Sequence, residues 1–127
     1  MKRFHVHISV RDLTRSIQFY TALFGNRPDA VNGDHARWTL SGTGVSFVIS
    51  SRGAMPGLNH LGFEIDQPEE FAAARDQLVK ANIFVTDQAG MSCCDVPVNR
   101  YWVSDPQGVS WETSHPHECE ASEAERP

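Results

Sequence analysis

The feature that most constrains the fold is an internal repeat. The stretch HVHI from His5 matches HLGF from His60 at an offset of 55 residues, and VSFVIS at 45–50 matches VSWETS at 109–114 at an offset of 64. The nine residues of difference fall between the second expected helix and the last expected strand, in the region that contains GMSCCDVP. The repeat predicts a mixed α+β fold of two similar modules, each with a strand, a helix and hairpin strands.

Hydrophobic periodicity places the elements of the first half. Residues 4–10 alternate between apolar and polar side chains, which is the period of a half-buried strand. Apolar residues then recur at helical spacing over 13–24, after Asp12 as an N-cap and before a glycine that closes the helix. Two alternating pieces joined by SGTG predict a hairpin over 35–41 and 45–50.

The second half repeats this pattern. NHLGFEID predicts a strand over 59–66, and Pro68 sits where a helix can begin, with helical spacing to about Asn82. RYWVS predicts another strand over 100–104. DPQG at 105–108 has Pro at the second and Gly at the fourth position, as a type I turn prefers, and it leads into the last strand, VSWETSH.

The length and charge fit one small domain. The chain has 127 residues, enough to bury a core without disulfides or metals as staples. Its formal net charge is −5, and the last ten residues contribute −3 of this. We expect one domain over 1–117, with modules at about 3–52 and 58–115, and a disordered acidic tail over 118–127.

The charge pattern also excludes two classes of partner. The chain has no basic patch or lysine-rich helix, so it lacks the electrostatic footprint of proteins that bind nucleic acid or anionic membranes. No apolar stretch approaches the length that spans a membrane, and FHVHISV is too polar for a signal peptide. We therefore expect a cytoplasmic protein.

Three cysteines are present, and two of them are adjacent. Neighbouring Cα atoms lie about 3.8 Å apart, below the usual span of a disulfide, so a bridge between Cys93 and Cys94 would be strained. Reduced thiols in a reducing compartment fit better. The simplest interpretation of such a pair is two small hydrophobic side chains, and thiol chemistry is the alternative.

Three residues are candidates for metal chemistry: His5 and His60 in the first strand of each half, and Glu112 in the last strand. If the halves pack about a pseudo-twofold axis, these side chains can converge. Two imidazoles and one carboxylate on one face of an ion leave the opposite positions open, as in non-heme Fe(II) oxygenases. The competing interpretation is that strand histidines are more often surface or hydrogen-bonded residues.

Together, HVHISVRDLTRSIQFYTALFG, NHLGFEID and WVSDPQGVSWE resemble the vicinal oxygen chelate superfamily, which includes glyoxalase I, fosfomycin-resistance proteins and extradiol dioxygenases. The resemblance covers about residues 3–115. It implies paired βαβββ modules that form a U-shaped, partly open barrel-like sheet around a divalent metal. The adjacent cysteines and the ending of the last motif are similar to one branch, the organoarsenical carbon–arsenic lyases and the cadmium-induced proteins.

The resemblance implies a role for each candidate residue. His5, His60 and Glu112 hold Fe(II), with Mn, Ni, Co or Zn as possible replacements, and Cys93 and Cys94 bind trivalent arsenic. Soft thiolates select thiophilic centres, so two adjacent thiols can hold one arsenic atom. The implied activity is an Fe(II)-dependent, dioxygenase-type cleavage of a trivalent organoarsenical to arsenite, in a chain that can form a homodimer.

Two alternative functions stay open at this point. The first is a non-catalytic protein of the cadmium-induced type that sequesters soft metals. The second is a glyoxalase-like or thiol-transferring resistance enzyme in which the cysteines are incidental.

Glyoxalase I usually has a fourth ligand, a carboxylate in the first half, where the internal repeat puts Val48 opposite Glu112. A three-ligand site fits oxygen activation better. A phosphonate pocket, as in fosfomycin-resistance proteins, is a weaker alternative. Such a pocket needs several cationic side chains, and the second half of this chain has few.

The remaining candidates each have two interpretations. His7 shares a strand face with His5 and is either an alternate ligand or a neighbour that supports the ligands. Tyr101 and Trp102 line a pocket for an organic substituent or fill the core. The last group is His115, His117 and Cys119. These residues belong either to a soft-metal cluster or to a solvated tail.

Overall fold

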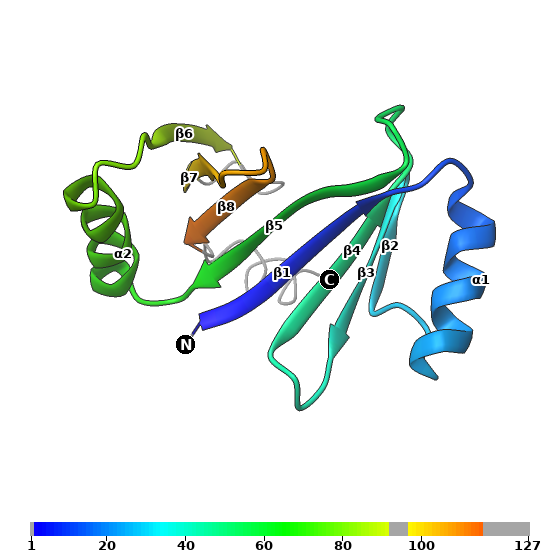
Figure 1. Cartoon of the computed structure of the whole chain (residues 1–127). Helices are drawn as coiled ribbons and strands as arrows, with labels where there is room; N and C mark the ends of the chain where they lie inside the picture. Colours follow the sequence, from blue (N-terminus) through cyan, green and yellow to red (C-terminus); the bar gives the residue numbers. More distant parts are fainter. Residues whose placement is uncertain (1, 92–96, 116–127) are drawn as a thin grey trace. The chain divides into compact units, whose positions relative to one another are not determined.

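The computed structural model describes residues 2–91 and 97–115. Over these residues the chain forms two helices and eight strands (Figure 1). In chain order they are β1 (Lys2–Ser9), α1 (Leu13–Phe24), β2 (Ala30–Asn32), β3 (His35–Leu40), β4 (Val45–Ser50), β5 (Gly57–Ile65), α2 (Pro68–Lys80), β6 (Thr86–Met91), β7 (Pro97–Ser104) and β8 (Ser110–His115).

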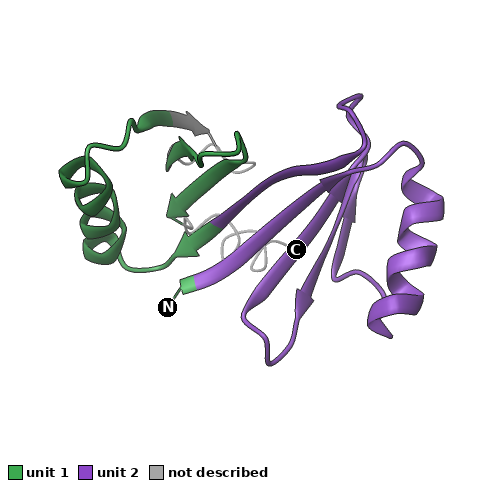
Figure 2. Ribbon diagram, viewed as in Figure 1, with its two compact units in different colours: residues 1–2, 63–127 green, residues 3–62 purple. Residues whose placement is uncertain are grey.

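The chain divides into two compact units, residues 3–62 as unit 2 and residues 1–2 with 63–127 as unit 1 (Figure 2). Hydrogen-bonded strands follow the order β2-β3-β4-β1-β5 in unit 2 and β5-β8-β7-β6 in unit 1, with β5 passing from one unit to the next. The two βαβββ runs thus use the same strand order. The expected α+β class and the paired modules are confirmed, while the module bounds of 3–52 and 58–115 stay predictions.

The core of unit 2 lies between α1 and one face of the sheet. α1 begins after Asp12, whose Oδ1 accepts a hydrogen bond of 3.0 Å from the Arg15 N–H, and ends at Phe24, where Gly25 caps it with φ of 77°. This confirms the helix predicted over 13–24. Buried Ala36, Trp38 and Ile49 form the centre of the core, and the residues packed around them are Ile8, Val10, Leu13, Ile17, Tyr20, Phe24, Leu40 and Phe47.

This packing determines which side of β1 stays away from the helix. β1 pairs in parallel with β4 in a register that sets His5 beside Ser46, His7 beside Val48 and Ser9 beside Ser50. Side chains alternate between the two faces of a strand. Because Ile8 packs on the core, the odd-numbered residues His5, His7 and Ser9 lie on the opposite face of the sheet.

Unit 1 has its own helix and core. α2 begins at Pro68 and ends at Lys80, two residues before the predicted end, because Asn82 adopts a left-handed conformation with φ of 62°. Phe71 of α2 packs against Tyr101, which is fully buried, with ring centroids 5.2 Å apart.

The structure also adds β2 and β6, which show too little apolar alternation to be predicted. Within the described residues, no helix is long and apolar enough to cross a membrane.

The turn between β7 and β8 matches the prediction from DPQG. Oδ1 of Asp105 accepts hydrogen bonds from the N–H groups of Val109 and Gln107, both at 2.9 Å, and Oδ2 accepts one from Trp111 Nε1–H at 3.3 Å. The N–H of Val109 is the main reason that the Asp105 pKa lies below its usual range. The turn fixes the antiparallel register in which Glu112 faces Trp102.

We expect Asp105→Ala to lower the thermal unfolding temperature by about 2–6 °C at neutral pH, since three donors lose their acceptor. A lowered folded-state pKa means that the carboxylate stabilises the fold above the ordinary aspartate pKa, and that this contribution is lost as the pH falls through the folded value. The difference between variant and wild type should therefore shrink in acid.

Thermal unfolding followed by circular dichroism across a pH series measures this effect. Asp76→Ala is the matched control, because Asp76 forms an exposed pair with Lys80 at 2.9 Å, and such pairs contribute little. If the difference in unfolding temperature between Asp105→Ala and wild type stays constant down to pH 2, the carboxylate charge does not support the turn.

Candidate metal centre

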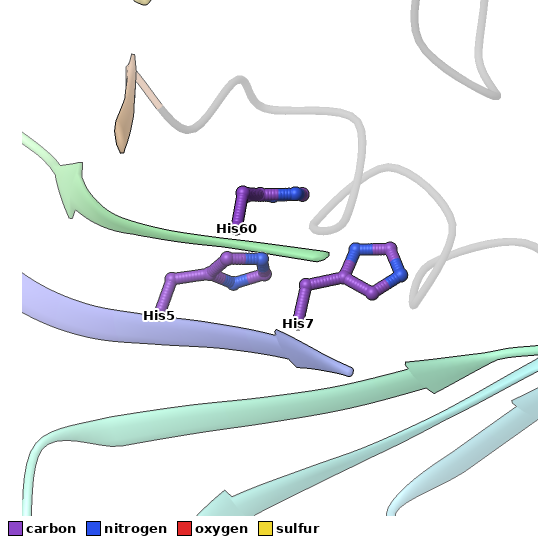
Figure 3. Close-up of side chains that lie close together, drawn as sticks. All are labelled: His5, His7 and His60. Atoms are coloured by element: carbon purple, nitrogen blue, oxygen red, sulfur yellow. The ribbon is translucent and has the colours of Figure 1, made fainter. Parts of the chain in front are cut away.

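Three histidines gather on the sheet face of unit 2 that α1 leaves uncovered (Figure 3). His5 and His7 come from β1 and His60 comes from the neighbouring strand β5. Their ligand nitrogens all lie within 4.8 Å of one another. The rings of His5 and His60 stack with centroids 5.4 Å apart, and the His7 centroid lies 4.8 Å from that of His60. The structure therefore places His5 and His60 together, as predicted, and adds His7.

A neighbouring amide orients His60. Nδ1 of His60 lies 2.8 Å from Oδ1 of Asn59, and the Asn59 amide donates to Ser9 Oγ at 2.9 Å. An amide oxygen only accepts, so Nδ1 of His60 carries the proton and Nε2 has the lone pair. Second partners of this kind fix the tautomer and the ring orientation of metal-binding histidines. His60 is 8% exposed, which holds its ring further in place.

His7 has a different partner. Its Nε2 lies 2.7 Å from the hydroxyl of Ser50 on β4. Partial burial lowers the pKa of His7 to about 4, and the neighbouring His5 adds to the shift. His7 is therefore neutral at physiological pH, which is the form of imidazole that binds a metal ion.

The donor set fits a divalent transition metal. Imidazole nitrogens suit Zn, Cu, Fe and Ni, whereas Mg and Ca prefer oxygen ligands. Metal–nitrogen bonds of about 2.0–2.1 Å put nitrogens that share one ion about 3–4 Å apart. Nitrogens within 4.8 Å of one another approach this spacing, so small side-chain rotations suffice to bring them onto one ion. The residues of unit 2 thus fit a metal centre.

Glu112, the third predicted ligand, lies in unit 1 on β8. Its side chain is 12% exposed, and Nη1 of Arg100 on β7 approaches Oε2 to 3.2 Å. A guanidinium that donates to a carboxylate in this way fixes the position of the carboxylate.

The other candidates fall into three groups. Cys93, Cys94, His117 and Cys119 lie outside the described residues. Tyr101 fills the core of unit 1, and Trp102 donates from Nε1 to Gln88 Oε1 at 2.6 Å. His115 packs on Phe71, and its Nδ1 lies 3.0 Å from the Ile65 carbonyl oxygen.

Sequence reasoning missed the groups that support the histidines. Asn59 precedes His60 directly, so a side-chain amide beside a candidate ligand was a visible signal. Ser9 and Ser50 had no such signal, because each lies at least 43 residues from its partner and meets it only through strand pairing.

The sequence profile of the Glyoxalase/Bleomycin resistance protein/Dioxygenase superfamily matches residues 2–113. The chain is 33% identical over 115 residues to a trivalent organoarsenical cleaving enzyme of Bacillus sp. (strain MD1), covering 88% of this chain and 71% of the relative. It is 28% identical over 113 residues to the cadmium-induced protein CadI of Mycobacterium bovis, covering 88% and 74%.

The structure is also similar to that of the Mn(II)-bound glyoxalase from Novosphingobium aromaticivorans. The TM-score is 0.66 at 16% identity, over 91% of this chain and 40% of the glyoxalase chain. At this level of identity the likeness bears on the fold alone. It agrees with the two βαβββ runs described above.

Proposed function

Because the chain belongs to the Glyoxalase/Bleomycin resistance protein/Dioxygenase superfamily, we propose that it is an Fe(II)-dependent, dioxygenase-type enzyme that cleaves the carbon–arsenic bond of trivalent organoarsenicals. One observation carries this proposal: His5 and His60 lie together on one sheet face, in a chain that is 33% identical to a trivalent organoarsenical cleaving enzyme. The family profile matches residues 2–113, a range that includes both histidines and Glu112.

In this proposal His5, His60 and Glu112 hold the metal. Asn59 lies against Nδ1 of His60 and orients its ring, and Arg100 pairs with the Glu112 carboxylate. A bound ferrous ion supplies redox chemistry that allows dioxygen to react with the organic group. Mn, Ni, Co or Zn can occupy the same donors in its place.

Cys93 and Cys94 bind the arsenic through their thiolates, since soft sulfur ligands prefer a thiophilic centre. The carbon–arsenic bond breaks, the carbon is oxidised by dioxygen, and arsenic leaves as arsenite with its oxidation state unchanged. The thiols stay reduced in the cytoplasm, where we place the protein. A homodimer is compatible with this proposal.

The test uses the full-length chain, reconstituted anaerobically with Fe(II) and then given a trivalent organoarsenical and air. Oxygen uptake and arsenic speciation are followed for wild type, for Cys93→Ser with Cys94→Ser, and for Cys119→Ser as the matched cysteine control. We expect wild type and Cys119→Ser to consume oxygen and release arsenite. The double variant should lose at least about 100-fold in kcat/KM, because the arsenic loses both ligands.

Other outcomes separate the alternatives. Turnover that survives in the double variant would favour a glyoxalase-like enzyme with incidental cysteines. The similarity to a cadmium-induced protein is the basis for the second candidate, in which this chain would bind soft metals without catalysis. Thiol-dependent binding of cadmium or arsenite by wild type, with no oxygen uptake, would support that candidate and contradict the lyase.

A further inference from the structure

We infer that His7 is a third imidazole ligand of the metal centre, so that unit 2 alone presents three nitrogens to a divalent first-row transition metal. The inference deepens the proposed function, because it concerns the metal centre on which that function rests. It changes the expected donor set from two histidines and a carboxylate to three histidines and a carboxylate.

Geometry is the first support. Nitrogens of His5, His7 and His60 lie within 4.8 Å of one another, and the three side chains are on the same face of β1 and β5 (Figure 3). The His7 ring lies closer to the ring of His60 than the His5 ring does, with centroid distances of 4.8 and 5.4 Å. A metal held between His5 and His60 therefore lies within reach of His7.

The hydrogen bond to Ser50 is the second support. It engages Nε2 of His7 at 2.7 Å, and when Nε2–H donates to the hydroxyl, the lone pair is on Nδ1, the nitrogen that would bind an ion. Ser50 is buried, so its hydroxyl holds the ring in a fixed orientation. A hydrogen-bonded second nitrogen is the usual arrangement of a metal-binding imidazole. His60 has the same kind of support from Asn59.

The internal repeat is the third support. The offset of 55 that relates His5 to His60 also relates His7 to Gly62, and the offset of 64 relates Val48 to Glu112. His7 and Val48 are partners in the β1–β4 register. Val48 is the equivalent of Glu112 in the first half, and it carries no ligand atom. Its strand partner His7 supplies one instead. Each half then contributes two donors, which are His5 with His7 and His60 with Glu112.

Three imidazoles have a chemical consequence. Three histidines form a stable centre for a divalent ion, and nitrogen-rich sites bind Co, Ni, Cu and Zn more tightly than Mn. Because the three nitrogens come from one unit, binding should survive the loss of Glu112. With only His5 and His60 as nitrogen donors, losing Glu112 would instead leave two ligands.

The test follows Co(II) binding to the metal-free, full-length protein under argon. Isothermal titration gives affinity and stoichiometry, and proton NMR counts the strongly shifted, exchangeable N–H signals of coordinated imidazoles. We expect one Co(II) and three such signals for wild type. His7→Ala should show two signals and an affinity lower by about 100-fold or more, since even supporting residues change metal affinity by about 10–100-fold. Glu112→Gln should keep all three signals.

The controls make the result decisive. His115→Ala removes a histidine of unit 1 whose Nδ1 lies 3.0 Å from the Ile65 carbonyl oxygen, and it should match wild type in affinity and signal count. His7→Gln keeps a side chain that can bond Ser50 but lacks the imidazole, so it should behave like His7→Ala if the ring is a ligand. The signal count in wild type requires no variant.

Two imidazole signals in wild type, or unchanged affinity in both His7 variants, would overturn the inference. Neither readout involves an arsenical or oxygen. Three imidazole signals without arsenite release would therefore contradict the proposed function and leave the ligand set standing. Arsenite release with only two imidazole signals would support the proposed function and contradict the role of His7 as a ligand.

Discussion

Replacing His60 by alanine is expected to abolish stoichiometric binding of a divalent metal at micromolar concentrations, and with it arsenite release. His60 is the nearest ring neighbour of both other histidines, and its tautomer is fixed by Asn59. Loss of a ligand should exceed the 10–100-fold that losing a supporting residue costs in affinity. Titration with Co(II) or Zn(II) measures the affinity directly.

A graded control accompanies this variant. Asn59→Leu leaves the ligand in place but removes the acceptor for Nδ1, so we expect an intermediate loss of about 10–100-fold. The thermal unfolding of the metal-free His60→Ala protein shows whether the fold persists, since His60 is buried. Wild-type affinity in a folded His60→Ala protein would remove His60 from the metal centre.

Trp38→Ala is expected to cost about 3–5 kcal/mol in the free energy of unfolding. Trp38 is 1% exposed, lies at the centre of the unit 2 core, and donates from Nε1 to the Asn26 carbonyl at 2.9 Å. The ring centroids of Tyr20, Phe24 and Phe47 lie 5.9, 5.6 and 6.1 Å from that of Trp38. Truncation removes these contacts and leaves a cavity that the sheet cannot fill by collapse.

Urea unfolding followed by circular dichroism measures this loss. Phe84→Ala is the matched aromatic control, because Phe84 is 85% exposed and its truncation should change stability by less than about 0.5 kcal/mol. Trp38→Phe keeps an aromatic ring, so its loss in the free energy of unfolding should lie between those of Trp38→Ala and Phe84→Ala. A Trp38→Ala protein as stable as the Phe84 variant would show that the helix and sheet of unit 2 are held by other contacts.

Much of the fold was predictable because its signals are local. The alternation of 4–10 gave the strand and both of its faces, and helical spacing with Asp12 gave α1. The DPQG sequence gave the turn that Asp105 closes. β2 and β6 were not predictable, since β2 has three residues and β6 reads TDQAGM without apolar alternation. These strands form because a paired neighbour satisfies their backbone, which no local pattern shows.

The candidate site divides in the same way. The repeat by itself identified His5 and His60 as equivalent positions, because identical residues recur at equivalent points of a duplicated pattern. The tertiary structure decided that His7 joins them, that Ser50 and Asn59 orient the rings, and that Arg100 pairs with Glu112. These contacts depend on which strands are neighbours and in what register, and a one-residue slip would turn every side chain to the other face. Sequence fixes the order of side chains along a strand, and strand pairing decides which of them meet.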